Sequence, residues 1–133
     1  MSEENVAVVQ AFADAFNRGD LPGALALLAD DGVVDEAGGM QHSGVFTGGA
    51  KGFASLVEIM TTNLDATIDE CELLDAGDTV VSKMVLTFSS KHTSRSTRQR
   101  VTELYTVKNG KITFLDSYYK NPAAVLAVQT EAE

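Results

Sequence analysis

Hydrophobic side chains follow a helical spacing near the start of the chain. Residues 3–17 carry apolar groups every three or four positions, which predicts an amphipathic helix. Asp20 and Pro22 are typical of the first turn of a second helix, and the leucines after them predict that it continues to about Asp30. Residues 48–63 have the pattern of a third helix. The first half of the chain is therefore predicted to be mainly helical.

Apolar and polar residues alternate through the second half of the chain. Four segments have the period of β-strands: residues 66–75, 79–92, 96–108 and 111–120. The segments that join them, AGD, KHTSRS and KNGK, are rich in turn residues, so the four strands are predicted to form an antiparallel meander. GVVDEAGG, residues 32–39, predicts a short additional strand, and Asn121 with Pro122 predicts a final short helix.

This order of elements predicts an α+β fold in a single domain of residues 1–133. The expected architecture is a cone, in which a strongly curved antiparallel sheet is covered on its concave face by the three helices of the N-terminal half. The mouth of such a cone is a natural pocket for a small molecule. The opposite face of the sheet would carry apolar positions. They are Val81, Val85, Leu104 and Phe114. Burial of that face between two copies predicts a homodimer.

An acidic residue interrupts the apolar face of one predicted strand. In RVTELYTV, residues 100–107, Val101, Tyr105 and Val107 share one face, and Glu103 falls on the same face. A buried carboxylate needs a partner, or else its pKa rises until it keeps its proton. Glu103 is therefore a candidate functional residue, and the alternative is an exposed position at which it pairs with Lys83 or an arginine.

Charge and composition exclude several classes of function. The net charge of −9 disfavours nucleic acid and anionic membranes as partners, because binding to phosphate needs a basic surface. The sequence has no apolar run of membrane-spanning length, and its first residues are acidic where a secretory signal would be basic, so we expect a cytoplasmic protein. The lone Cys71 has no nearby ligand partner, and no metal or cofactor is expected.

The order of these elements, together with the segments FADAFNRGDLPGALALLADDGVV and ELYTVKNGKITFLDSYYKNPAAV, resembles the nuclear transport factor 2-like superfamily. That superfamily includes ketosteroid isomerases, SnoaL-like polyketide cyclases, scytalone dehydratase and limonene epoxide hydrolase. The resemblance covers nearly the whole chain. It implies the fold more strongly than the reaction, since this scaffold hosts enzymes as well as binding and assembly domains.

The resemblance to ketosteroid isomerases implies a pair of catalytic carboxyl groups. Their base aligns with Glu36, although the adjacent Asp35 is the alternative because only one of the two can face inward. Their second acid, which donates a hydrogen bond to the developing enolate, falls on Glu103. Phe12 stands where those enzymes have a tyrosine, so steroid isomerase activity itself is not expected.

Other residues complete the expected pocket. Tyr105 and Tyr119 are candidate hydrogen-bond donors that would assist Glu103. Candidate substrate-binding residues lie on the first helix, on the strands and in the loop MQHSG. They are Phe12, Phe16, Met84, Leu86, Phe88, Leu115, Ser117 and His42.

Two classes of function remain open. In the first, a cofactor-independent enzyme isomerises, cyclises or dehydrates a small, largely apolar carbonyl or polyketide-like compound, with Glu36 as base and Glu103 as acid. In the second, the domain binds a hydrophobic ligand or serves in dimerisation without catalysis. A protonated Glu103 in a closed cavity would favour the enzyme, and a solvated, salt-bridged Glu103 would favour the binding module.

Overall fold

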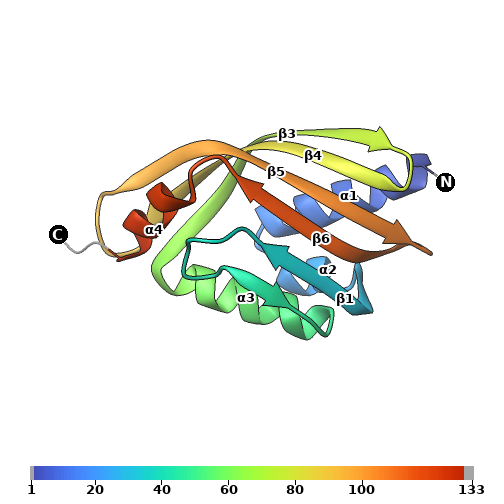
Figure 1. Ribbon diagram of the computed structural model, residues 1–133, viewed down its shortest axis with the longest axis horizontal. Coiled ribbons are helices and arrows are strands. Elements are labelled where there is room, and N and C mark those ends of the chain that lie inside the picture. The colour runs from blue at the N-terminus through green and yellow to red at the C-terminus, as the bar shows by residue number, and fades with distance from the viewer. Residues whose placement is uncertain (1, 131–133) are drawn as a thin grey trace.

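The structure is a computed structural model that describes residues 2–130 (Figure 1). Its helices are α1 (Ser2–Asn17), α2 (Leu21–Leu25), α3 (Ala50–Asn63) and α4 (Pro122–Thr130). Its strands are β1 (Leu28–Glu36), β2 (Gly44–Phe46), β3 (Leu64–Ala76), β4 (Thr79–Ser90), β5 (Ser96–Lys108) and β6 (Lys111–Tyr119). Within these residues, no helix is both long and apolar enough to cross a membrane.

The strands form one curved sheet in the order β2-β1-β6-β5-β4-β3. Helices α1, α2 and α3 lie along one side of this sheet, and α4 packs against β4 and β5 near one end (Figure 1). The predicted α+β fold, with three helices on the concave face of a curved sheet, is confirmed. The sheet departs from the predicted antiparallel arrangement at one place, because β1 runs parallel to β6.

The second helix is shorter than the leucine spacing predicts. Asp20 caps α2 as expected, since its Oδ1 accepts the backbone N–H of Gly23 at 3.0 Å, but the helix ends at Leu25. The backbone N–H of Ile112 donates to the carbonyl of Leu27 at 2.8 Å, and from Leu28 onward the chain belongs to β1. The predicted continuation to Asp30 is therefore wrong, because pairing with β6 prevails over local helical preference.

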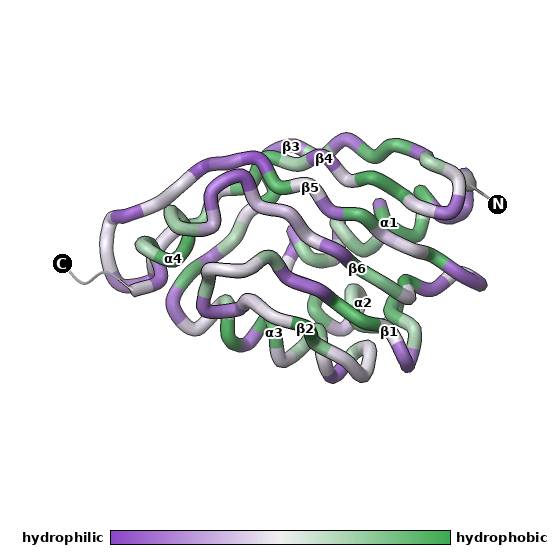
Figure 2. Tube along the Cα trace, in the orientation of Figure 1, coloured by the Kyte–Doolittle hydropathy of each residue, from purple (hydrophilic) through white to green (hydrophobic). Residues whose placement is uncertain are grey.

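Apolar side chains between the helices and the sheet form two adjoining core clusters. One cluster gathers under α1 and α3 around Phe12, Phe53 and Leu115, and the other lies under α4 around Phe88 and Val101. Figure 2 shows hydrophobic positions alternating with hydrophilic ones along the strands, as the pleat of a sheet requires. The polar residues that interrupt this inward face define the site described below.

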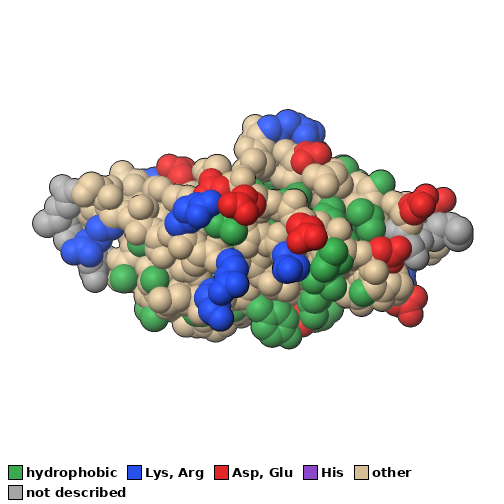
Figure 3. Space-filling model, turned by 90° about the horizontal axis from the view of Figure 1, so that it is seen from above, with side chains coloured by type: hydrophobic (Ala, Val, Ile, Leu, Met, Phe, Trp, Pro, Cys, Tyr) green, Lys and Arg blue, Asp and Glu red, His purple; other side chains and the backbone are tan. Residues whose placement is uncertain are grey.

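The outer face of the sheet carries a row of exposed and half-buried apolar groups. Leu74 on β3 pairs with Val81 on β4, which pairs with Leu104 on β5, and Leu74 is 41% exposed. Val85 and Phe114 are half-buried. Hydrophobic side chains lie among charged ones in the view from above the sheet (Figure 3). The homodimer inferred from the sequence remains a prediction, and this row is the surface on which it would form.

We expect the protein to sediment as a dimer and the double variant Val81→Lys, Leu104→Lys to sediment as a monomer. Two like charges at directly paired positions would repel the same groups on a second copy. Analytical ultracentrifugation measures the mass, and circular dichroism checks that the variant keeps its fold. A wild-type monomer at high protein concentration would contradict this prediction.

Candidate functional site

A row of polar side chains crosses the concave face of the sheet. Glu103 on β5 lies opposite Ser82 on β4 and opposite Ser117 on β6. Ser117 donates a hydrogen bond to Oε1 of Glu36 on β1. Glu36, Ser82 and Ser117 are 6%, 1% and 2% exposed, whereas Glu103 between them is half-buried where it borders the cavity. The strand register therefore brings together two carboxyl groups that lie 67 residues apart in the sequence.

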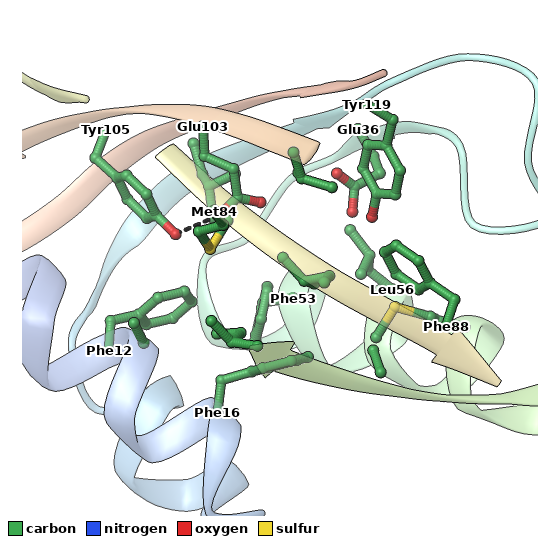
Figure 4. A pocket seen from close by; sticks show the side chains of 17 residues that line it. Phe12, Phe16, Glu36, Phe53, Leu56, Met84, Phe88, Glu103, Tyr105 and Tyr119 are labelled. Carbon is green, nitrogen blue, oxygen red and sulfur yellow. Dashed lines mark hydrogen bonds between the residues drawn. The ribbon is translucent and has the colours of Figure 1, made fainter. Parts of the chain in front are cut away.

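These carboxyl groups border a largely apolar cavity between the sheet and helices α1 and α3 (Figure 4). The volume open to the centre of a water-sized sphere is about 50 Å³, and all empty space around it, including open solvent at the mouth, is about 540 Å³. The lining residues are Phe12, Ala13, Phe16, Glu36, Phe53, Leu56, Met60, Ala66, Ile68, Met84, Leu86, Phe88, Val101, Glu103, Tyr105, Leu115 and Tyr119. Such a lining suits a small apolar ligand with few polar atoms.

Each carboxyl group has one oxygen held by a hydroxyl group. Tyr105 donates to Oε1 of Glu103 at 2.5 Å, and Ser117 donates to Oε1 of Glu36. Among residues 2–130, neither Oε2 atom has a hydrogen-bond partner, although every fully enclosed polar side-chain atom there has one. The two Oε2 atoms therefore border the open space of the cavity, where a ligand could meet them.

Burial raises the pKa values of both carboxyl groups. Loss of hydration raises the pKa of Glu36 to about 8, and the nearby charge of Glu103 adds to the effect. Loss of hydration likewise raises the pKa of Glu103 to about 7 against the opposing hydrogen bond from Tyr105. Near neutral pH the pair retains at least one proton, so a carboxylic acid stands beside a carboxylate.

Tyr119 connects the cavity to a buried histidine. Its ring stacks on Phe88 with centroids 5.5 Å apart, and its hydroxyl group lies beside the carboxyl group of Glu36 (Figure 4). Behind it, Nε2 of His42 lies 3.2 Å from the Tyr119 hydroxyl oxygen, and Nδ1 of His42 lies 3.1 Å from Nε2 of Gln129 on α4. Burial lowers the pKa of His42 to about 4, so its ring is neutral at pH 7.

The structure brings most of the predicted site residues together. Tyr105 and Tyr119 line the cavity with both glutamates, as do six of the predicted substrate-binding residues. These are Phe12, Phe16, Met84, Leu86, Phe88 and Leu115. Ser117 contacts Glu36, and His42 lies behind Tyr119, outside the cavity wall.

Asp35 is not part of this cavity. It neighbours Glu36 on β1, and successive side chains on a strand point to opposite faces, so Asp35 lies on the outer face. The choice that the sequence left open between these two acids is therefore settled in favour of Glu36 as the one inside. The salt bridge considered for Glu103 is absent among residues 2–130, because Lys83 instead lies 3.9 Å from Glu72 on the exposed face.

Sequence reasoning missed part of the site. Helical spacing puts Phe53 and Leu56 on the apolar side of α3 without assigning them to the pocket, yet they form its wall from that helix. Ser82 interrupts an apolar strand face just as Glu103 does, and that signal could have identified it. Gln129 shares the buried side of α4 with Val125 and Val128, which marks it as an unusual polar group on an apolar face.

A metal centre has no candidate ligands in the described part of the chain. Among residues 2–130, no three or more His, Cys, Asp or Glu side chains are arranged to hold a metal ion. The cavity instead presents carboxyl and phenol groups on an apolar wall.

Comparison with known proteins places the chain among proteins of the same fold. A family model described as the SnoaL-like domain matches residues 9–115. The crystal structure of a nuclear transport factor 2-like protein from Burkholderia xenovorans LB400 has a TM-score of 0.82 at 26% identity and covers 98% of each chain. These matches confirm the superfamily inferred from the sequence. No curated protein is significantly similar in sequence.

Two further structures share the fold at lower identity. A candidate polyketide cyclase from Xanthomonas campestris pv. campestris has a TM-score of 0.82 at 23% identity and covers 96% of this chain and 98% of its own. TerC, crystallised with polyporic acid, has a TM-score of 0.84 at 18% identity and covers 96% of this chain and 99% of its own.

We expect Glu103→Gln and Glu36→Gln each to stabilise the protein more at pH 8.5 than at pH 5. Both pKa values are raised in the folded state, so the folded protein binds more protons than the unfolded chain above about pH 4.5, and its stability falls as pH rises toward 8. A neutral amide removes this loss of stability, which for shifts of this size amounts to about 2 to 4 kcal/mol between pH 5 and pH 8.5.

Urea unfolding at the two pH values measures this difference. Glu58→Gln, on the exposed side of α3, is the matched control and should change the free energy of unfolding little at either pH. Equal effects of the buried substitutions at pH 5 and pH 8.5 would contradict the prediction.

Proposed function

Because this chain belongs to the SnoaL-like domain family, we propose that it is a cofactor-independent enzyme that moves protons on a small, largely apolar carbonyl compound. The observation that carries the proposal is the burial of Glu36 and Glu103 in one apolar cavity, each with an oxygen that borders open space. The names of two structural neighbours, a candidate polyketide cyclase and a protein crystallised with polyporic acid, support the same substrate class.

Glu36 is proposed as the base. Once ionised, its Oε2 can accept a proton from a carbon next to a carbonyl group, while Ser117 keeps the other oxygen in place. The desolvation that raises its pKa makes the carboxylate a stronger base than a solvated glutamate.

Glu103 is proposed as the acid. Tyr105 occupies its Oε1, so a proton carried by Oε2 can be donated to the ligand's carbonyl oxygen as negative charge develops there. The repulsion between the two carboxyl groups favours the state in which one is ionised and the other is protonated. The higher pKa of Glu36 puts the proton on Glu36 in most molecules near neutral pH, so the proposed reaction starts from the less populated form in which Glu103 carries it.

The outcome of the reaction depends on where the abstracted proton or electron pair goes next. Return of the proton to a different carbon gives isomerisation. Attack of the carbanion on a second carbonyl group gives ring closure, and loss of a hydroxyl group from the neighbouring carbon gives dehydration. Each outcome begins with the same proton transfer, and the aromatic wall that includes Phe12 and Phe53 keeps bulk water away from it.

We expect the protein to exchange deuterium into the carbon next to the carbonyl group of a ketone ligand. Ketones such as 2-acetylnaphthalene and 1-tetralone are incubated with the protein in D₂O, and exchange is followed by proton NMR. Glu36→Gln should slow exchange by at least about 10²-fold, because an amide cannot accept the proton. Glu103→Gln should slow it less, because its amide still donates a hydrogen bond.

The two variants also test which glutamate has which role. If Glu103→Gln slows exchange more than Glu36→Gln does, the two roles are reversed. The control variant Glu58→Gln should exchange at the wild-type rate. If the ketones bind saturably but neither the wild type nor any variant exchanges deuterium, the result would favour the alternative, a domain that binds an apolar ligand without catalysis. Neither binding nor exchange across the panel would overturn the proposal.

A further inference from the structure

A buried chain of hydrogen bonds runs from helix α4 to the wall of the cavity. Gln129 is 5% exposed and His42 is 0% exposed, and together they link the backbone of Gln41 to the hydroxyl group of Tyr119. Neither Gln129 nor His42 borders the cavity. Their effect on a ligand would therefore pass through Tyr119.

The direction of every hydrogen bond in this chain follows from its first member. The backbone N–H of Gln41 can only donate, so the Gln129 atom that it meets at 3.0 Å must be the amide oxygen. The amide nitrogen of Gln129 then faces Nδ1 of His42 at 3.1 Å and must donate to it. Nδ1 is consequently the unprotonated nitrogen of the neutral ring.

The remaining proton of His42 then lies on Nε2, which faces the hydroxyl oxygen of Tyr119 at 3.2 Å. That oxygen accepts from His42, so the phenolic proton is free to point away from the histidine. Stacking on Phe88 fixes the plane of the tyrosine ring, and its hydroxyl group lies on the cavity side next to Glu36 (Figure 4).

The loop that carries His42 is itself held in place. Ser43 accepts the backbone N–H of Met40 at 2.8 Å and donates to the carbonyl of Ala37, which ties the loop to the end of β1. The imidazole is thereby positioned from its own loop and from α4 at once.

We propose that Gln129 and His42 are positioning residues that set the Tyr119 hydroxyl group as a hydrogen-bond donor to an oxygen of the bound ligand. This inference rests on the proposed function in that it requires a carbonyl ligand in the cavity. The Tyr119 hydroxyl group is then a third polar group beside the two carboxyl groups. The ligand class is therefore a flat apolar compound whose acceptor oxygen, when bound, lies at the end of the cavity near Glu36 and Tyr119. An apolar ligand without an acceptor oxygen would gain nothing from this group.

The arrangement can first be tested without any ligand. In protein labelled with ¹⁵N-histidine, the nitrogen chemical shifts of His42 should be those of a neutral ring protonated on Nε2 throughout pH 6 to 8. The variant His92→Gln assigns the signals, since the chain has two histidines. Protonation on Nδ1, or titration of His42 within this range, would overturn the proposal.

A matched pair of probes then tests the effect on ligands. The probes are 2-acetylnaphthalene, which has an acceptor oxygen, and 2-isopropylnaphthalene, which has a similar shape and none. Tyr119→Phe should weaken binding of the ketone by about 3- to 10-fold, the range expected for one hydrogen bond, and leave binding of the hydrocarbon unchanged. An equal change for both probes, or none for either, would overturn the proposal.

Variants of His42 separate positioning from a purely structural role. His42→Leu should weaken ketone binding alone, and His42→Gln, whose amide can donate near the place of Nε2, should restore part of it. In the Tyr119→Phe background, His42→Leu should not further change the ratio of the affinity for the ketone to the affinity for the hydrocarbon. An additive effect in that background would mean that His42 acts only by supporting the fold, which would overturn its assigned role.

These results are separable from the test of proton transfer. A ketone that binds with the expected dependence on Tyr119 but exchanges no deuterium would refute the proposed catalysis and support the donor role. Deuterium exchange that is indifferent to Tyr119 and His42 would support the catalysis and refute the donor role.

Discussion

The candidate site depends on the burial of two carboxyl groups on the concave face of one sheet. Among residues 2–130, no salt bridge reaches Glu36 or Glu103, and their neighbours are hydroxyl groups and apolar walls. A buried carboxylate without a cation is tolerated only if it is hydrogen-bonded or protonated. The hydroxyl groups of Ser117 and Tyr105 meet the first need, and a retained proton meets the second. The cavity, the pairing of strands and the covering helices all maintain this arrangement.

Strand register converts scattered polar residues into a site. The pairs between β4, β5 and β6 place Ser82, Glu103 and Ser117 side by side, and the parallel pairing of β1 with β6 adds Glu36 to the same row. A shift of one residue in any of these pairs would turn a member of the row to the outer face, as Asp35 already is. The site therefore requires the register of the whole sheet, and the helices serve to exclude water from it.

The sequence is sufficient to predict the features that follow from the alternation and spacing of apolar residues, namely helices, strands and the faces on which their residues lie. The period of two along β5 by itself assigns Glu103 to an apolar face, and the helical spacing of residues 3–17 predicts α1. Local spacing misleads at Leu28, where pairing with β6 decides the conformation. It also cannot place His42 against Gln129, because that contact joins a loop to a helix 87 residues away and leaves no periodic trace. Contacts of this kind come from tertiary packing.

The same desolvation explains both the cost of the site to stability and its capacity for chemistry. Removing water raises the pKa values of Glu36 and Glu103, which makes the folded protein less stable at alkaline pH than one with amides there. A sheet that served only as a scaffold would gain stability from apolar residues at these positions. Yet the raised pKa values also keep one proton on the pair near neutral pH, and they make whichever carboxyl group is ionised a stronger base than a solvated glutamate. At these positions the sheet carries carboxyl groups where apolar residues would be more stabilising. An active site would require such a departure, because it needs a base, an acid and a positioned phenol in one cavity.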